Sequence, residues 1–136
     1  MDVIFDYQDA GLCRFGKLYR PVAEVFLYSN SYNKWLKVWM VVDTGADHSI
    51  LPKYFSNSLG ISLNQDCNKE WTTGIGGDQK IFMLKKLLRI KLGEVEHYVP
   101  MAISENDNIP PIMGRLGFID SFNVEFLIKR KVVFKT

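Results

Sequence analysis

One acidic residue of the chain follows an apolar run and opens a turn of small residues. Residues 40–42 read Met-Val-Val and lead into the segment Asp43-Thr44-Gly45-Ala46-Asp47. A carboxylate at the end of a buried strand is unfavourable unless it is hydrogen-bonded or used in chemistry. Gly45 permits a tight turn whose backbone N–H groups approach that carboxylate, and the Thr44 hydroxyl can be buried beside an acceptor. The pattern predicts a catalytic role for Asp43, with a structural turn aspartate as the alternative.

Two later segments add to this signal. Thr73-Gly74-Ile75-Gly76-Gly77 places one apolar residue among three glycines, between two segments that read as strands. Such a tip has little side-chain bulk, so its backbone can lie against an extended ligand. A plain hairpin turn is the alternative, and a phosphate cradle is disfavoured because no Gly-Lys-Ser/Thr follows. The third segment, Pro111-Ile112-Met113-Gly114-Arg115, puts an apolar pair and a glycine before a predicted helix.

These three segments, in this order, resemble the retropepsin-like aspartic proteases, the single-domain family that includes the retroviral enzymes. The resemblance runs from about Tyr19 to Phe134. It implies a mainly β fold, with a closed β-barrel, a β-hairpin flap and one short C-terminal helix. It also implies an endopeptidase that needs no cofactor or metal. Leu116 stands where retroviral enzymes usually carry a polar residue, and the tail after Gly114 is longer than theirs and looks more like that of the cellular and bacterial members.

The resemblance assigns roles by position. Asp43 matches the catalytic aspartate, Thr44 matches a residue that hydrogen-bonds across a two-fold axis, and Gly45 and Ala46 complete the active-site turn. Asp47 matches a contact to the substrate backbone and the partner of an arginine at position 115, so a structural ion pair between Asp47 and Arg115 is expected. The residues matched to substrate binding are Asp47, Thr73, Gly74, Ile75 at the flap apex, Gly76, Gly77, and Ile112 in a pocket wall.

The family's reaction needs two carboxylates, but this chain carries a single Asp-Thr-Gly. In that reaction one ionised carboxylate takes a proton from water while the other, protonated, donates to the carbonyl oxygen. Two carboxyls that close share one proton and titrate as a pair. We therefore expect a homodimer in which two Asp43 side chains meet on the symmetry axis. The expected substrate is an extended peptide or protein, with activity favoured at acidic pH.

The elements that must position these residues read mainly as strands. Alternating or β-branched segments bounded by turn residues predict strands, whereas helical signals are few and short. Gly93-Glu94 is expected to join two of the strands as a hairpin turn. The predicted strands are 22–28, 35–42, 81–92, 95–103, 123–128 and 131–134, and the predicted helices are 52–59 and 115–122.

Composition limits the other functions open to the chain. With 136 residues, 47% apolar and 24% charged, it reads as one domain spanning 1–136, with 1–18 as a candidate N-terminal arm. A net charge of +2 argues against a nucleic-acid or membrane partner. No signal peptide or membrane-spanning segment is recognisable, so a cytoplasmic location is expected. Cys13 and Cys67 are taken as free thiols.

Other readings of the chain remain open. His48 and His97 have no Cys or Glu at metal-ligand spacing, so no metal site is expected. The basic cluster 129–131 reads as a solvated turn. The alternative to a protease is a module that keeps the same fold, grips an extended peptide or protein, and cleaves little or nothing. A purely structural β-domain is the third option.

Overall fold

The structure is a computed structural model that describes residues 1–74 and 76–136. Strands dominate it, and helical structure is limited to the short helix α1 (Phe55–Leu59) and one 3-10 turn, η1 (Ile119–Ser121), in the part described. The mainly β prediction is confirmed. The strands are β1 (Asp2–Asp6), β2 (Gln8–Cys13), β3 (Gly16–Arg20), β4 (Val22–Ser29), β5 (Lys34–Val42), β6 (Ile50–Leu51), β7 (Cys67–Gly74), β8 (Gly77–Leu84), β9 (Leu88–Leu92), β10 (Val95–Val99), β11 (Ala102–Ser104), β12 (Ile112–Met113), β13 (Asn123–Leu127) and β14 (Lys131–Lys135).

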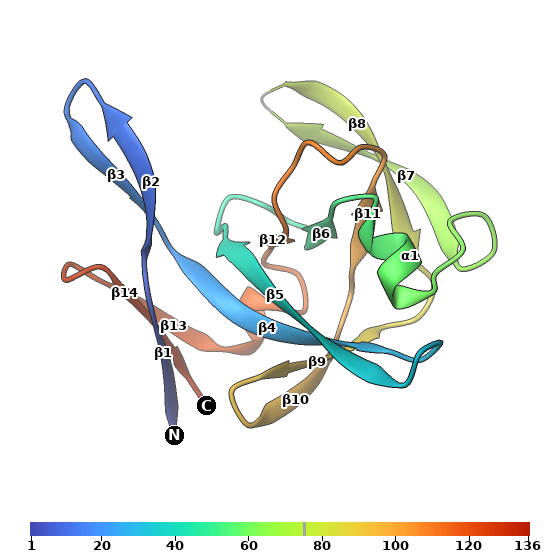
Figure 1. Cartoon of the computed structure of the whole chain (residues 1–136). Coiled ribbons are helices and arrows are strands. Elements are labelled where there is room, and N and C mark those ends of the chain that lie inside the picture. The colour runs from blue at the N-terminus through green and yellow to red at the C-terminus, as the bar shows by residue number, and fades with distance from the viewer. Residues whose placement is uncertain (75) are drawn as a thin grey trace.

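Nine of these strands form one curled sheet in the order β10-β9-β4-β5-β12-β6-β11-β8-β7 (Figure 1). The long antiparallel pair β4–β5 runs from Val22 opposite Val41 to Ser29 opposite Lys34. Burial alternates along β4, because successive side chains of a strand point to opposite faces. The inward face packs into a core that includes Val25, Leu27, Met40, Ile90, Leu92, Ile103, Met113, Phe118 and Phe134.

The two ends of the chain lie together in a separate three-stranded sheet of order β1-β14-β13. Strand β14 is central in this sheet and pairs with β1 and β13, so Phe134 lies opposite both Val3 and Val124. Strands β2 and β3 form a two-stranded hairpin that projects from the rest of the molecule (Figure 1). The candidate arm 1–18 is therefore one paired strand followed by most of this hairpin.

Several predicted strands end where turn-forming residues interrupt them. The segment 81–92 is divided at Lys85-Lys86 into β8 and β9, and 95–103 is divided at Pro100 into β10 and β11. The predicted hairpin at Gly93-Glu94 is confirmed, since β9 pairs with β10 from Leu92 opposite Val95 onward. The two strands predicted at the C-terminal end correspond to β13 and β14.

The helix predicted over 115–122 does not form. This segment makes turns that end in η1, whereas α1 lies within the other predicted helix, 52–59. The physical cause is Gly117, whose φ of 67° is left-handed and incompatible with a continuing right-handed helix. A Cβ at this position would lie 2.4 Å from the Cδ of Pro100, so the turn also depends on a close approach that only glycine allows.

None of the helices in the described residues is sufficiently long and apolar to span a lipid bilayer.

Candidate active site

Asp43 directly follows strand β5 and begins a loop that is held by backbone hydrogen bonds. β12 runs parallel to β5, with Ile112 beside Val41 and Met113 beside Val42. The backbone N–H of Asp43 donates to the carbonyl of Met113 over 3.0 Å, and that of Val41 donates to Pro111 over 2.9 Å. On the other side the Val42 N–H donates to the Pro21 carbonyl over 2.9 Å, so the main chain is hydrogen-bonded to both neighbouring segments up to the residue that carries the carboxylate.

The carboxylate of Asp43 is held by the turn that follows it. The Gly45 N–H donates to Asp43 Oδ1 over 3.0 Å, and the Ala46 N–H donates to the Asp43 carbonyl over 3.2 Å. Asp43 is half-buried, while Thr44 and Gly45 are exposed. Within the described residues no other hydrogen bond reaches the carboxylate. Its second oxygen, Oδ2, is therefore uncommitted in the single chain and free to bind a proton, water or a second carboxyl group.

A buried serine connects the active-site loop to the third motif. The Gly114 N–H donates to Ser49 Oγ over 2.9 Å, and the Ser49 carbonyl accepts a bond from Ala102 over 2.9 Å. Gly114 packs so closely against this loop that a Cβ would lie 2.4 Å from the carbonyl carbon and oxygen of His48. The glycine of the third motif is thus required by close backbone contact.

The expected ion pair between Asp47 and Arg115 is not formed in this structure. Arg115 Nη2 lies 3.0 Å from Asp120 Oδ1, and both side chains are about half exposed. The two segments are joined through their backbones: the Arg115 N–H donates to Ala46 and the Leu116 N–H to Asp47, each over 2.9 Å. The turn that replaces the predicted helix carries Asp120 back towards Arg115, which explains the change of partner.

The glycine-rich segment forms the tip of the β7–β8 hairpin, at one edge of the curled sheet. Gly74 pairs with Gly77, and Thr73 Oγ1 donates to Asp78 Oδ1 over 2.8 Å across the two strands. Thr73, Gly74, Gly76 and Gly77 are exposed, and a Cβ on any of these glycines would meet open space. Ile75, the predicted apex, lies outside the described residues. The hairpin and the active-site loop make no hydrogen bond to each other in the portion of the chain described.

The other predicted pocket residue lies next to Asp43. Ile112 is half-buried between β5 and β6, opposite Val41 on one side and Ile50 on the other. Sequence reasoning missed the contribution of Ser49, because a serine after Asp47-His48 has no distinctive pattern. His48, to which the sequence assigned no role, is half-buried, and its Nδ1 is enclosed without a hydrogen-bond partner among the described residues.

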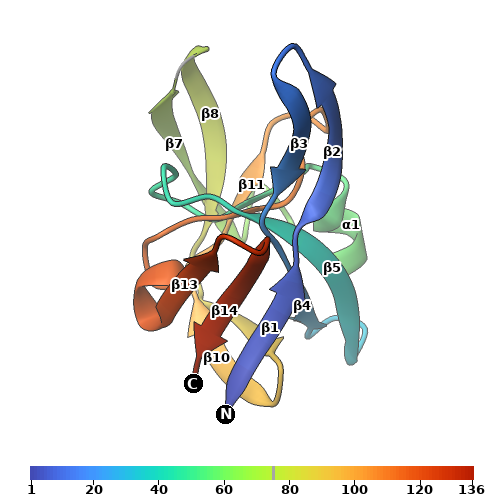
Figure 2. The same ribbon diagram turned by 90° about the vertical axis from the view of Figure 1, so that its left-hand side faces the viewer.

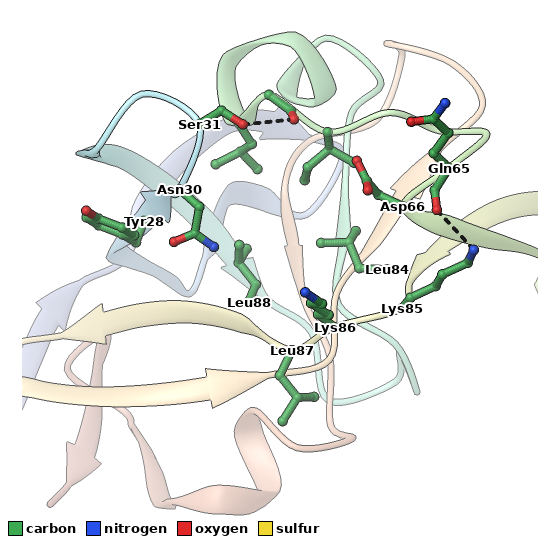
Figure 3. A pocket seen from close by; sticks show the side chains of 13 residues that line it. Tyr28, Asn30, Ser31, Gln65, Asp66, Leu84, Lys85, Lys86, Leu87 and Leu88 are labelled. Atoms are coloured by element: carbon green, nitrogen blue, oxygen red, sulfur yellow. Dashed lines mark hydrogen bonds between the residues drawn. The ribbon is translucent and has the colours of Figure 1, made fainter.

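A pocket of about 340 Å³ lies on another part of the molecule (Figure 3). Its lining comes from the end of β4, the loop after α1 and the segment joining β8 to β9, with Leu59 and Leu88 buried and Lys86 exposed. The Ser31 hydroxyl donates to the Gly60 carbonyl over 3.1 Å, and Lys85 Nζ donates to the Gln65 carbonyl over 3.0 Å. None of its described lining residues belongs to the loop 43–49 or to the flap tip, so this pocket is separate from the candidate active site.

Within residues 1–74 and 76–136, no group of three or more His, Cys, Asp or Glu side chains is placed to bind a metal ion. The available chemistry is that of carboxyl groups. Asp43 offers one partly accessible carboxylate just after a strand whose backbone is hydrogen-bonded to its neighbours.

The sequence and the fold were compared with those of known proteins. Residues 32–116 match a family model described as gag-polyprotein putative aspartyl protease. No curated protein matches the sequence. Among solved structures, the chain is similar to the crystal structure of a retropepsin-like aspartic protease from Rickettsia conorii, with a TM-score of 0.67. The two sequences are 18% identical, and the match covers 98% of each chain. This likeness shows a retropepsin-like fold.

Proposed function

The chain belongs to the gag-polyprotein putative aspartyl protease family, and on that premise we propose that it is an aspartic endopeptidase that works as a homodimer. Asp43 is its catalytic residue. The observation that carries the proposal is the carboxylate at the end of β5, held through Oδ1 by the Gly45 N–H and uncommitted at Oδ2 within the described chain. A carboxylate used only to cap a turn does not need a rigid strand and a parallel neighbour behind it.

The dimer supplies the second carboxyl group. The sequence contains one Asp-Thr-Gly segment, so one chain offers one such group. Two copies related by a two-fold axis through this site bring two Asp43 carboxyls to one water molecule. Because two carboxyls that close cannot both ionise readily, the pair holds one proton. We expect cleavage to be favoured at acidic pH and to be lost when that shared proton is removed.

The reaction then follows from the two protonation states. The ionised carboxylate takes a proton from water, whose oxygen bonds to the carbonyl carbon of the scissile peptide. The protonated carboxyl group donates its proton to the carbonyl oxygen. As this tetrahedral gem-diol collapses, one hydroxyl gives its proton to the ionised carboxylate while the protonated carboxyl group donates to the nitrogen. The C–N bond breaks, the acid and the amine leave, and the carboxyl pair again holds one proton. No metal or covalent enzyme intermediate is required.

The substrate is an extended peptide or protein segment bound across the active-site loop. The residues Asp43 to Asp47 form the floor of its groove, with Thr44, Gly45 and Ala46 supporting the catalytic carboxylate. The flap tip, 73–77, covers the substrate, and Ile112 forms part of an apolar wall. His48 Nδ1 is enclosed without a partner among the described residues, which is unfavourable for a polar atom.

The test is a peptide-library digest with the wild-type chain and with Asp43→Asn, in the presence and absence of pepstatin. We expect acidic cleavage by the wild type, inhibition by pepstatin, and loss of at least about a thousandfold in kcat/KM for the variant, because its amide cannot act as a base. Circular dichroism and urea unfolding provide the control, since the Gly45 N–H can still donate to the side-chain oxygen of the substituted asparagine.

Two outcomes would contradict the proposal. Cleavage that persists in Asp43→Asn would assign the activity to another group or to a contaminant. Tight binding of extended peptides by both proteins, without cleavage at any pH, would support the binding module on the same fold.

A further inference from the structure

The β2–β3 hairpin exposes large apolar side chains on a two-stranded sheet that joins no other strand in the described chain. From here on, the arm means this β2–β3 hairpin, residues 8–20, and not the wider candidate segment 1–18. Leu12, Phe15 and Leu18 are 77%, 90% and 46% exposed, and Phe15 lies in the turn at the tip. An isolated two-stranded hairpin is marginally stable in water. A projecting hairpin with these side chains exposed is therefore expected to gain stability by being covered.

Apolar groups lie on both faces of the arm. Leu12 pairs with Lys17, so these two residues share a face, and Leu18, next along the strand, lies on the other. At its base the arm meets the turn between β13 and β14, where the Arg130 guanidinium lies 4.0 Å from the centre of the Tyr19 ring. Between base and tip the two strands are held together by Asp9, which accepts hydrogen bonds from the Gly11 N–H and from Lys17 Nζ. The arm is thus preformed but uncovered.

The base of the arm is adjacent to the active-site carboxylate. Pro21 follows directly after β3, and its carbonyl accepts a hydrogen bond from the Val42 N–H over 2.9 Å, one residue before Asp43. The arm and the β7–β8 flap project to the same side of the molecule, as the two perpendicular views show (Figures 1 and 2). The base of the arm thus lies beside the active-site loop, and the arm extends to the same side of the molecule as the flap.

We propose that the arm is a dimerisation element that packs against a second copy of this chain. The proposal rests on the proposed function, which requires two Asp43 carboxyls to share one water and so places the two-fold axis within a few ångström of Asp43. With strand neighbours separated by about 5 Å, the arm begins close to that axis. A five-residue strand such as β3 extends about 17 Å, so the partner subunit lies within reach of Leu12, Phe15 and Leu18.

The turn beside the three-stranded sheet of the termini also favours a second copy as the partner of the arm. In this sheet β14 is paired on both sides, so among the described residues only β1 and β13 have an edge without a strand partner. Ile128, in the turn next to Arg130, is fully exposed, and this turn meets the base of the arm. The exposed apolar surface therefore continues from the arm onto the adjoining turn, beside the place where the second subunit must dock.

The experiment compares dimerisation of the full chain with that of the triple variant Leu12→Ser, Phe15→Ser, Leu18→Ser by analytical ultracentrifugation. Removal of three large apolar contacts is expected to raise the dimer Kd by about a hundredfold or more. Tyr98→Ser is the matched control, because Tyr98 is 63% exposed on β10, the sheet edge opposite the flap, and its Kd should not change. Circular dichroism verifies that each variant is folded.

A second measurement needs no substitution. Cys13 lies on the arm and is exposed, whereas Cys67 is buried, so iodoacetamide labels the arm of the native protein selectively. The proposal predicts that Cys13 alkylation becomes at least about fivefold slower as the protein concentration passes through the dimer Kd. A constant alkylation rate across that range would overturn it, as would a triple variant that dimerises like the wild type.

These outcomes are distinct from those that test the proposed function. Dimerisation is measured without substrate, and Asp43→Asn should dimerise normally. A wild-type dimer that cleaves peptides and is unaffected by the triple substitution would reject the arm as the interface and leave the protease intact. A dimer that depends on the arm but cleaves nothing would support the arm as the interface and reject the protease. A wild type that stays monomeric at every concentration would overturn the arm proposal.

Discussion

Gly114 and Ser49 hold the loop that follows Asp43. The first allows two backbone segments to approach closely, and the second accepts the Gly114 N–H in the interior. Neither residue carries charge or takes part in the proposed chemistry. Their effect is positional, because a catalytic carboxylate displaced by even about 1 Å loses much of its efficiency.

Gly114→Ala should therefore disturb the active site and the fold together. The added Cβ would overlap the His48 carbonyl group, and relief of such overpacking costs about 1–3 kcal/mol. We expect a lower urea midpoint and a fall in kcat. Gly74→Ala is the matched control, since a Cβ there meets nothing within 4 Å, and its unfolding free energy should stay within about 0.5 kcal/mol of the wild type. Equal stability of the two variants would contradict this account of Gly114.

The two thiols should differ in reactivity. Burial raises the pKa of Cys67, and the neighbouring charge of Asp66 adds to this while Lys85 opposes it. In the folded chain the Cys67 thiolate therefore forms at higher pH than in the unfolded chain, so the native state loses stability as pH rises through the ordinary thiol range. We expect one alkylated cysteine, Cys13, in the native protein at about pH 8 and two in urea, as mass spectrometry would show. Rapid native alkylation of Cys67 would contradict its burial.

At this scale the sequence predicted which motifs lie together better than which side chains pair. The segments that carry Asp43 and Ile112 lie side by side because β12 runs parallel to β5, and the three motifs already suggested that proximity. The partner of Arg115 was predicted wrongly, because it depends on the local turn at Gly117. Ser49 was missed because the value of a buried hydroxyl depends on an N–H that lies 65 positions away in sequence.

At the scale of elements, the alternation of apolar residues predicted most of the sheet. The strands β4, β5, β13 and β14 coincide closely with predicted segments, and β9 and β10 lie within longer ones, because side-chain alternation directly reflects a half-buried strand. The helix over 115–122 was wrong since its apolar spacing fits a helix although Gly117 adopts a left-handed conformation. The β2–β3 hairpin was only a candidate arm in the sequence, because its exposed strands carry no clear alternation.

The flap hairpin offers a test of element geometry. Thr73→Val removes the hydroxyl that donates to Asp78 across the two strands while keeping the side-chain volume. An exposed hydrogen bond of this kind contributes about 0.5–1 kcal/mol, so we expect kcat/KM to fall about two- to fivefold with little change in the urea midpoint. Thr72→Val is the control, since Thr72 makes no side-chain hydrogen bond to the described residues. An effect of equal size in both variants would show that the Thr73 bond does not order the flap.

At the scale of the whole molecule, one chain provides half of the proposed active site. Its curled sheet carries Asp43 at the end of β5, and the flap and the arm rise on the same side of the molecule (Figure 2). The single Asp-Thr-Gly led to the prediction of two copies, which remains a prediction. The surface proposed to join them could not be predicted from the sequence, because it depends on which apolar side chains remain exposed after folding.

The central claim is that each active site contains two Asp43 carboxyls, one from each chain. Wild-type and Asp43→Asn subunits are mixed in varying ratio, well above the dimer Kd and at constant total concentration, and peptide cleavage is measured after exchange. If both carboxyls are required, activity falls as the square of the wild-type fraction, to about a quarter in an equal mixture. Activity that falls only in proportion to the wild-type fraction, to about a half, would mean that each chain acts alone and would contradict the account.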